Sequence, residues 1–151
     1  MKHYCLLSIR SESPKIPLAI LLPSTFAKLS FEDYQSAANV ARAKRWAKLQ
    51  SGFKLVQSND LPRYCWTLSS DNEVAGSDLY EHICWLLAHF ECGVVLRDSH
   101  RYGIKCELSF YWGGGGTGGG PTISPELSEL LQRHQIALDI GFYYETEEVN
   151  T

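Results

Sequence analysis

Apolar and polar residues alternate along two segments near the C-terminus, and each alternation predicts a β-strand. The first segment is Ile104–Trp112 and the second is Ile136–Tyr144. Successive side chains of a strand point to opposite faces, so a period of two gathers the apolar residues on one face. Strands that are apolar on one side only favour an antiparallel or mixed sheet with helices on that side.

The segment between these two strands has the pattern of an amphipathic helix, Ser124–His134. Ser124 is a suitable N-cap, and Pro125 suits the first helical position because the N–H that it lacks would have no intrahelical partner there. Glu126 complements the positive end of the helix dipole. The apolar positions then recur at the spacing of one helix face: Leu127, Leu130 and Leu131.

Further strands and helices are predicted earlier in the chain. Both faces of Lys2–Arg10 are partly apolar, which predicts a central strand, and Tyr64–Ser69 alternates like the two C-terminal strands. Ser30–Asp33 resembles a capping box, which predicts a helix over Phe31–Gln50. Ser77 is a suitable cap for another helix over residues 78–91.

Two shorter segments are less regular. Ile16–Leu22 fits either a strand or a short helix, and Phe53–Gln57 fits a short strand or a hairpin arm. Together the patterns predict a single α+β domain over residues 1–151, with a four- to five-stranded, mainly antiparallel or mixed sheet and about three helices packed on one face. The polar residues 145–151 are expected to form a frayed tail.

The composition disfavours several classes of protein. A chain of 151 residues with 44% hydrophobic and 21% charged residues is long enough to bury a core and is not typical of disorder. The net charge of −3 disfavours non-specific binding to nucleic acid, which requires a basic surface. No apolar run is long enough to span a bilayer, and the apolar stretch after Met1 is too short for a signal peptide. We therefore expect a cytoplasmic protein that binds neither nucleic acid nor membranes.

The five cysteines are expected to be free thiols. Their number is odd, and none stands in a C-x-x-C pair. Three of them lie in predicted strands and are interpreted as small core residues: Cys5, Cys65 and Cys106.

A run of glycines with one threonine, Gly113–Gly120, is the strongest anomaly of composition. It matches the G-x-G-x-x-G pattern of a dinucleotide site, but any glycine run matches that pattern, and Pro121–Pro125 separates the run from the helix. The absence of a following Lys-Ser or Lys-Thr excludes a P-loop. We interpret the run as a surface loop. The alternative is an anion cradle of backbone N–H groups, formed by Gly113, Gly115, Thr117 and Gly118.

A charged segment, Arg97–Arg101, connects the helix over residues 78–91 to the strand that begins at Ile104. It contains serine, histidine and aspartate, but a catalytic triad requires these groups to converge in space, and the chain has no G-x-S-x-G motif. Our hypothesis for a functional surface is that the glycine run meets this segment at one end of the sheet, beside Arg97, Asp98, His100 and Arg101.

No metal site or cofactor is expected from the sequence. His82 and His89 are two helical turns apart, about 10 Å, which is too far for both to bind one ion directly. Metal-binding histidines on a helix are typically four residues apart.

Three stretches of the chain carry a resemblance to a known family. They are Trp66–Ser70, Ser109–Gly113 with Gly120–Leu127, and Ile136–Ile140. In these stretches the chain resembles the uncharacterised bacterial family called domain of unknown function 4279, over about the last two thirds of its length. The resemblance implies a small α+β domain with alternating strands and helices. It implies no catalytic residue, and the long glycine run and Tyr143-Tyr144 depart from the family pattern.

The sequence therefore favours a non-enzymatic protein-binding module, most specifically a bacterial immunity protein or inhibitor that neutralises a basic toxin domain by binding and occluding it. The basis is the lack of a catalytic motif, an aromatic content of 12% and an acidic tail that attracts a basic partner. The candidate partner-binding residues are Arg97, Asp98, His100, Arg101, Tyr111, Trp112, Tyr143, Tyr144, Glu145, Glu147 and Glu148.

Two alternative functions remain open. One is a protein that binds a small ligand, nucleotide or phosphate through the glycine run Gly113–Gly120 and the segment Arg97–Arg101. The other is a homo-oligomeric interaction protein, in which two copies pair through an exposed edge strand. The sequence allows either a monomer or a homodimer.

Overall fold

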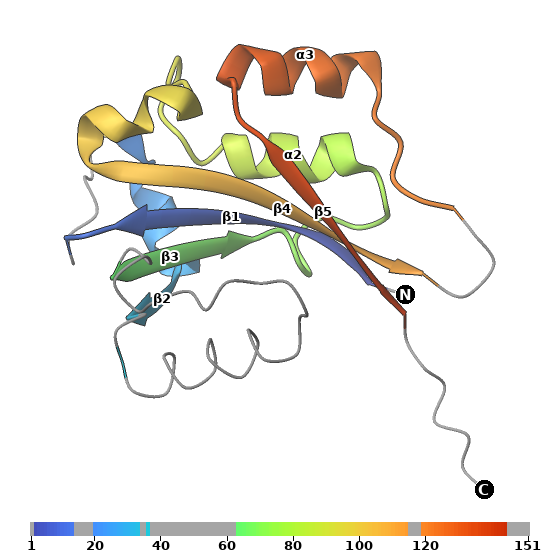
Figure 1. Cartoon of the computed structure of the whole chain (residues 1–151), viewed down its shortest axis with the longest axis horizontal. Helices are drawn as coiled ribbons and strands as arrows, with labels where there is room; N and C mark the ends of the chain where they lie inside the picture. The colour runs from blue at the N-terminus through green and yellow to red at the C-terminus, as the bar shows by residue number, and fades with distance from the viewer. Residues whose placement is uncertain (1, 14–19, 34–35, 37–62, 115–118, 145–151) are drawn as a thin grey trace, which may run out of the picture.

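Five strands form one open mixed sheet in the computed structural model, which describes residues 2–13, 20–33, 36, 63–114 and 119–144 (Figure 1). The strands β1 and β4 lie in the middle of the sheet, and each neighbouring pair is antiparallel except β4 and β5, which run parallel. The predicted α+β fold class with a mixed sheet is confirmed. In spatial order the strands are β2 (Ser30–Asp33), β3 (Tyr64–Ser69), β1 (His3–Ser11), β4 (Ile104–Gly114) and β5 (Leu138–Tyr144).

Two α-helices and a 3-10 helix lie on the same side of this sheet (Figure 1). They are α2 (Leu79–Leu87), α3 (Pro125–His134) and η4 (Leu96–Tyr102), and a further 3-10 helix is η2 (Pro23–Lys28). We call the side of the sheet that they cover the helix face. Alternate residues of the central strands are buried on this face because they pack against the apolar sides of the helices. The most deeply buried of them are Cys5, Leu7, Ile9, Leu68, Leu108 and Phe110.

The caps of the two α-helices explain where the helices begin. The Ser124 hydroxyl accepts the N–H of Leu127 at 3.1 Å, as predicted. For α2 the predicted cap is wrong by one residue, because the side chain of Asp78 rather than Ser77 accepts the N–H of Tyr80, at 2.9 Å.

The helix α2 also ends earlier than predicted, at Leu87. Beyond it, the N–H of Leu22 donates to the carbonyl of His89 at 2.9 Å, and the N–H of Glu91 donates to the carbonyl of Ile20 at 2.9 Å. This long-range backbone pairing replaces the last helical turn that local periodicity predicts.

The predicted helix start at Ser30–Asp33 is wrong, because this segment is the edge strand β2, paired with β3. The Phe31 ring lies 5.9 Å from that of Tyr64 and 5.3 Å from that of Trp66. These cross-strand aromatic contacts stabilise the extended conformation over the helical one. The rest of the predicted helix Phe31–Gln50, the predicted segment Phe53–Gln57 and most of Ile16–Leu22 lie outside the described residues.

The side chain of His134 joins the end of α3 to the start of η4, because its Nδ1 accepts the N–H of Leu96 at 3.2 Å. Burial, and secondarily the neighbouring Arg133, lowers the pKa of His134 below its usual value. Burial also lowers the pKa values of His3 and His89. The folded state therefore binds fewer protons at these sites than the unfolded state does.

Acidification is therefore expected to destabilise the fold through these histidines. The unfolding free energy should fall as the pH drops from about 7.5 through the ordinary histidine pKa of about 6.5, because protons bind preferentially to the unfolded chain. Urea unfolding at several pH values measures the slope, and His134→Gln should reduce it. A His134→Gln slope equal to that of the wild type would contradict this assignment.

Candidate functional site

The charged segment that connects α2 to β4 forms the 3-10 helix η4, and two of its contacts lie within the segment. Arg97 Nε lies 3.2 Å from an oxygen of Asp98, and Nδ1 of His100 donates to the carbonyl of Arg97 at 3.0 Å. Ser99 is buried, while Arg101 is exposed. The serine, histidine and aspartate thus do not form a triad.

The predicted meeting of this segment with the glycine run is wrong for the described glycines Gly113 and Gly114, because they and η4 lie at opposite ends of β4 (Figure 1). The helix η4 ends just before Ile104, whereas Gly113 and Gly114 are the last residues of the strand. Gly113 lies nine positions after Ile104 along the extended strand, which corresponds to about 30 Å. Gly113 and Gly114, which the structure describes, therefore do not form an anion pocket together with Arg97–Arg101.

The aromatic residues predicted to bind a partner lie instead at the C-terminal end of β4 and β5. The parallel register places Tyr143 beside Gly113 and Tyr144 beside Gly114. The Tyr111 ring stacks on Tyr4 with centroids 5.0 Å apart. Trp112 lies on the helix face and contacts His3, with ring centroids 4.2 Å apart. The remaining candidate residues lie outside the described part of the chain: Glu145, Glu147, Glu148, Gly115, Thr117 and Gly118.

An open cavity of about 520 Å³ lies beside Trp112, where the N-terminal ends of α2 and α3 come together near the end of β4. Trp112 is the aromatic residue that β4 contributes to its lining. Both helix caps also line it, so their positions are fixed by the hydrogen bonds that start the helices. The described residues around the cavity are Ser77, Asp78, Leu79, Tyr80, Trp112, Gly120, Thr122, Ser124 and Glu126.

The charges around this cavity are negative. Asp78 caps α2, and Glu126 lies in the first turn of α3, so each carboxylate complements the positive end of its own helix. A hydrogen bond with Cys84 and then the negative charge of the Cys84 thiolate form raise the pKa of Tyr80, with smaller contributions from desolvation and from Glu126. The phenol of Tyr80 can donate a hydrogen bond. This arrangement suits a cationic group better than an anion.

A buried serine–histidine pair lies between the end of β3 and α2 but is closed to substrate. The Nδ1 atom of His82 lies 2.6 Å from Oγ of Ser70, and both side chains are 0% exposed. Nε2 of His82 faces the carbonyl of Gly76 at 3.2 Å, which can only accept, so Nε2 carries the proton and Nδ1 accepts from Ser70. A catalytic nucleophile requires access that this hydroxyl lacks.

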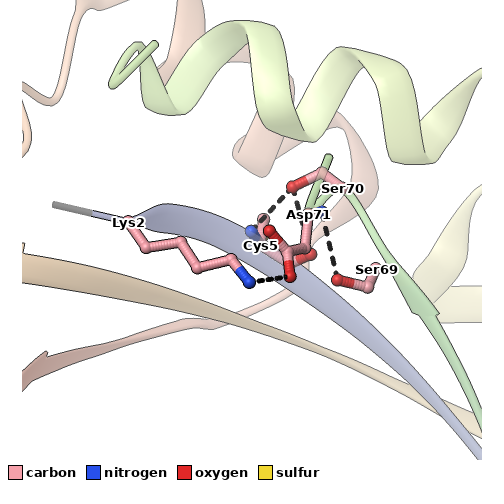
Figure 2. A network of polar contacts seen from close by, with 5 residues as sticks. All are labelled: Lys2, Cys5, Ser69, Ser70 and Asp71. Atoms are coloured by element: carbon pink, nitrogen blue, oxygen red, sulfur yellow. Dashed lines mark hydrogen bonds and ion pairs between the residues drawn. The ribbon is translucent and has the colours of Figure 1, made fainter. Parts of the chain in front are cut away.

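The same hydroxyl belongs to a polar network that connects β1 and β3, shown in Figure 2. The N–H of Cys5 donates to Oγ of Ser70 at 2.8 Å, and the N–H of Ser70 donates to the carbonyl of Cys5 at 3.0 Å. Next to it, the N–H of Asp71 donates to the Ser69 hydroxyl at 3.1 Å, and Lys2 Nζ lies 2.6 Å from an Asp71 oxygen. These contacts fix the end of β3 against β1.

The five cysteines are free, and the three in strands are buried as predicted. Burial raises the pKa of Cys5 to about 12 and that of Cys106 to about 11, so neither supplies a thiolate at neutral pH. Cys92 is exposed and Cys84 is half-buried. Within the described ranges, no group of three histidine, cysteine, aspartate or glutamate side chains is placed to hold a metal ion.

The sequence patterns did not indicate that the residues lining the cavity lie together. Asp78 and Glu126 stand 48 positions apart, as their numbers show, and each was interpreted only in relation to its own helix. Phe142 was also missed, although its side chain is 57% exposed. Its place in an alternating strand predicted a core position, and only the edge position of β5 exposes it.

Comparison of the chain with protein-family models, with curated proteins and with solved structures found no match. The resemblance to domain of unknown function 4279 therefore stays a prediction. No helix in the part of the chain that the structure describes is long and apolar enough to cross a bilayer.

Proposed function

We propose that this protein is a non-enzymatic binding module of the immunity-protein kind, which neutralises a basic toxin by binding and occluding it. The observation that carries the proposal is the cavity whose lining includes Trp112 and two acidic residues, Asp78 and Glu126. A tryptophan and two carboxylates suit a lysine or arginine side chain, through cation–π attraction and charge-assisted hydrogen bonds.

The surroundings of the cavity suit a protein partner better than a free small molecule. Ile123 is 49% exposed and stands between Thr122 and Ser124, which line the cavity. An exposed apolar side chain next to a pocket provides contact area around an inserted charged residue. The net charge of −3 favours a basic partner during encounter.

The alternative function, binding of a small anionic ligand, loses support because the two segments expected to form its site are separated. Arg97–Arg101 lies before the start of β4, whereas the described glycines Gly113 and Gly114 lie at its end. The helix N-termini at the cavity are already complemented by Asp78 and Glu126. Added phosphate is therefore not expected to stabilise the protein.

Removing the two carboxylates of the cavity should weaken partner binding at least tenfold, or about 1.4 kcal/mol. The variant is Asp78→Asn with Glu126→Gln, because asparagine preserves the helix cap while removing the charge. Affinity capture on the immobilised protein identifies the partner, and calorimetry with the purified partner measures the dissociation constant of each variant. A parallel assay of the partner's toxic activity tests occlusion.

The matched control is Glu91→Gln with Glu129→Gln, which changes the net charge equally at exposed positions outside the cavity lining. It should bind like the wild type at moderate salt, since only long-range steering is altered. Failure to retain a stoichiometric protein partner would refute the proposed function. Equal affinities of the cavity and control variants would show that the cavity is not the binding site.

A further inference from the structure

The strand β5 is an edge strand without the usual protection of such strands. Its inner edge pairs with β4 over residues Leu138 to Tyr144, and no described strand pairs with its outer edge. Natural sheets protect their edges with short strands, charged side chains, proline or bulges. The other edge strand, β2, follows this rule with four residues, two of them acidic. In contrast, β5 has seven residues, no proline, no lysine or arginine, and Asp139 as its one charged residue.

An apolar side chain is held in place at this edge. Phe142 is 57% exposed, the largest exposed fraction among the large apolar side chains that the structure describes. Its ring lies against the backbone of Gly120, where an added Cβ would be 3.6 Å from the ring. An exposed aromatic ring that is already packed on one side costs little entropy to bury, which is typical of an interface.

The opposite face of β5 is flat at its centre. Gly141 has no side chain, and the Tyr111 ring of β4 occupies that space, 3.4 Å from where a Cβ would stand. Asp139 is the acidic residue of the strand. An antiparallel neighbour of the same sequence is therefore acceptable only if the two Asp139 residues do not stand opposite each other, since directly opposed like charges are destabilising.

We propose that β5 pairs with β5 of a second copy, antiparallel about a two-fold axis at Gly141, to form a continuous ten-stranded sheet. This register pairs all seven residues of the strand. On the helix face, Ile140 of each copy lies opposite Phe142 of the other copy. Asp139 then stands opposite position 143, so the two carboxylates are four positions apart along the pair, about 13 Å. The pairing buries Phe142 and satisfies the outer backbone groups of both strands.

This dimer is independent of the proposed partner-binding function. The carboxylates at the cavity belong to α2 and its cap and to α3, whereas the dimer is formed by β5. If the dimer is not found, the proposed toxin binding is therefore unaffected. If no toxin partner is found, the proposed dimer is unaffected.

The substitution Phe142→Lys tests the pairing, because it introduces a lysine beside the axis in each copy without altering a buried side chain. Sedimentation equilibrium should give the wild type twice the chain mass of 17.0 kDa, and the dissociation constant of Phe142→Lys should be at least about tenfold larger. Ile123→Lys is the control, because it makes the same chemical change at an exposed residue outside β5. It should remain dimeric.

A second measurement uses the unmodified protein. Amide hydrogen exchange of residues 138–144 should slow as the protein concentration rises through the dissociation constant, while the rest of the sheet is unaffected. A wild type that remains monomeric at a protein concentration of about 100 μM would overturn the proposal, and an extended partner segment would then be the occupant of the edge. A dimer that Phe142→Lys leaves unchanged, or unchanged exchange in β5, would also overturn it.

Discussion

Replacing Phe110 with alanine is expected to lower the free energy of unfolding by about 3–5 kcal/mol, because the ring is fully buried and its removal leaves a cavity. The ring belongs to the continuous core and lies against His82, with centroids 5.7 Å apart, and near Trp112, at 6.3 Å. Its loss therefore also removes support from the aromatic residue beside the cavity. Urea denaturation monitored by circular dichroism measures the change.

A control for Phe110→Ala stands on the same strand. Lys105 is on the other face of β4, its side chain is 73% exposed, and its ion pair with Glu107 is at the surface. Lys105→Ala should therefore cost less than about 1 kcal/mol. If both variants lower the free energy of unfolding by a similar, small amount, the buried face of β4 does not stabilise the core.

Replacing Ser70 with alanine is expected to cost about 2–4 kcal/mol, although only one oxygen atom is removed. The change leaves two fully buried groups without a partner, Nδ1 of His82 and the N–H of Cys5, and each unsatisfied group costs about 1–3 kcal/mol. Differential scanning calorimetry of the variant should show a midpoint lowered by roughly 10 °C for a chain of this size.

The neighbouring serine provides the comparison. Ser69 is half-buried, and its hydroxyl accepts one backbone N–H, that of Asp71, which water can satisfy in its place (Figure 2). Ser69→Ala should lower the unfolding free energy by less than about 1 kcal/mol. If Ser70→Ala is no more destabilising than Ser69→Ala, the buried network does not stabilise the junction of β1, β3 and α2.

The local patterns of the sequence determined most of the elements that make up this fold. The alternation of Lys2–Arg10 predicted β1 and its central position, and that of Ile104–Trp112 predicted β4. The serine and proline before Leu127 predicted the start of α3. These predictions succeeded because side-chain periodicity and capping depend on residues within one or two turns of each other.

Other features depended on contacts between distant segments, and the sequence alone did not contain them. Ser30–Asp33 has the residues of a helix cap, yet pairing with β3 makes it a strand. The burial of His82 requires Ser70 and Gly76 as partners. The cavity requires α2 and α3 to begin at the same place, and the exposure of Phe142 requires β5 to be an edge strand. Strand order and helix placement are set by the free energy of the whole packed core, so tertiary structure alone decided which surfaces are available for binding.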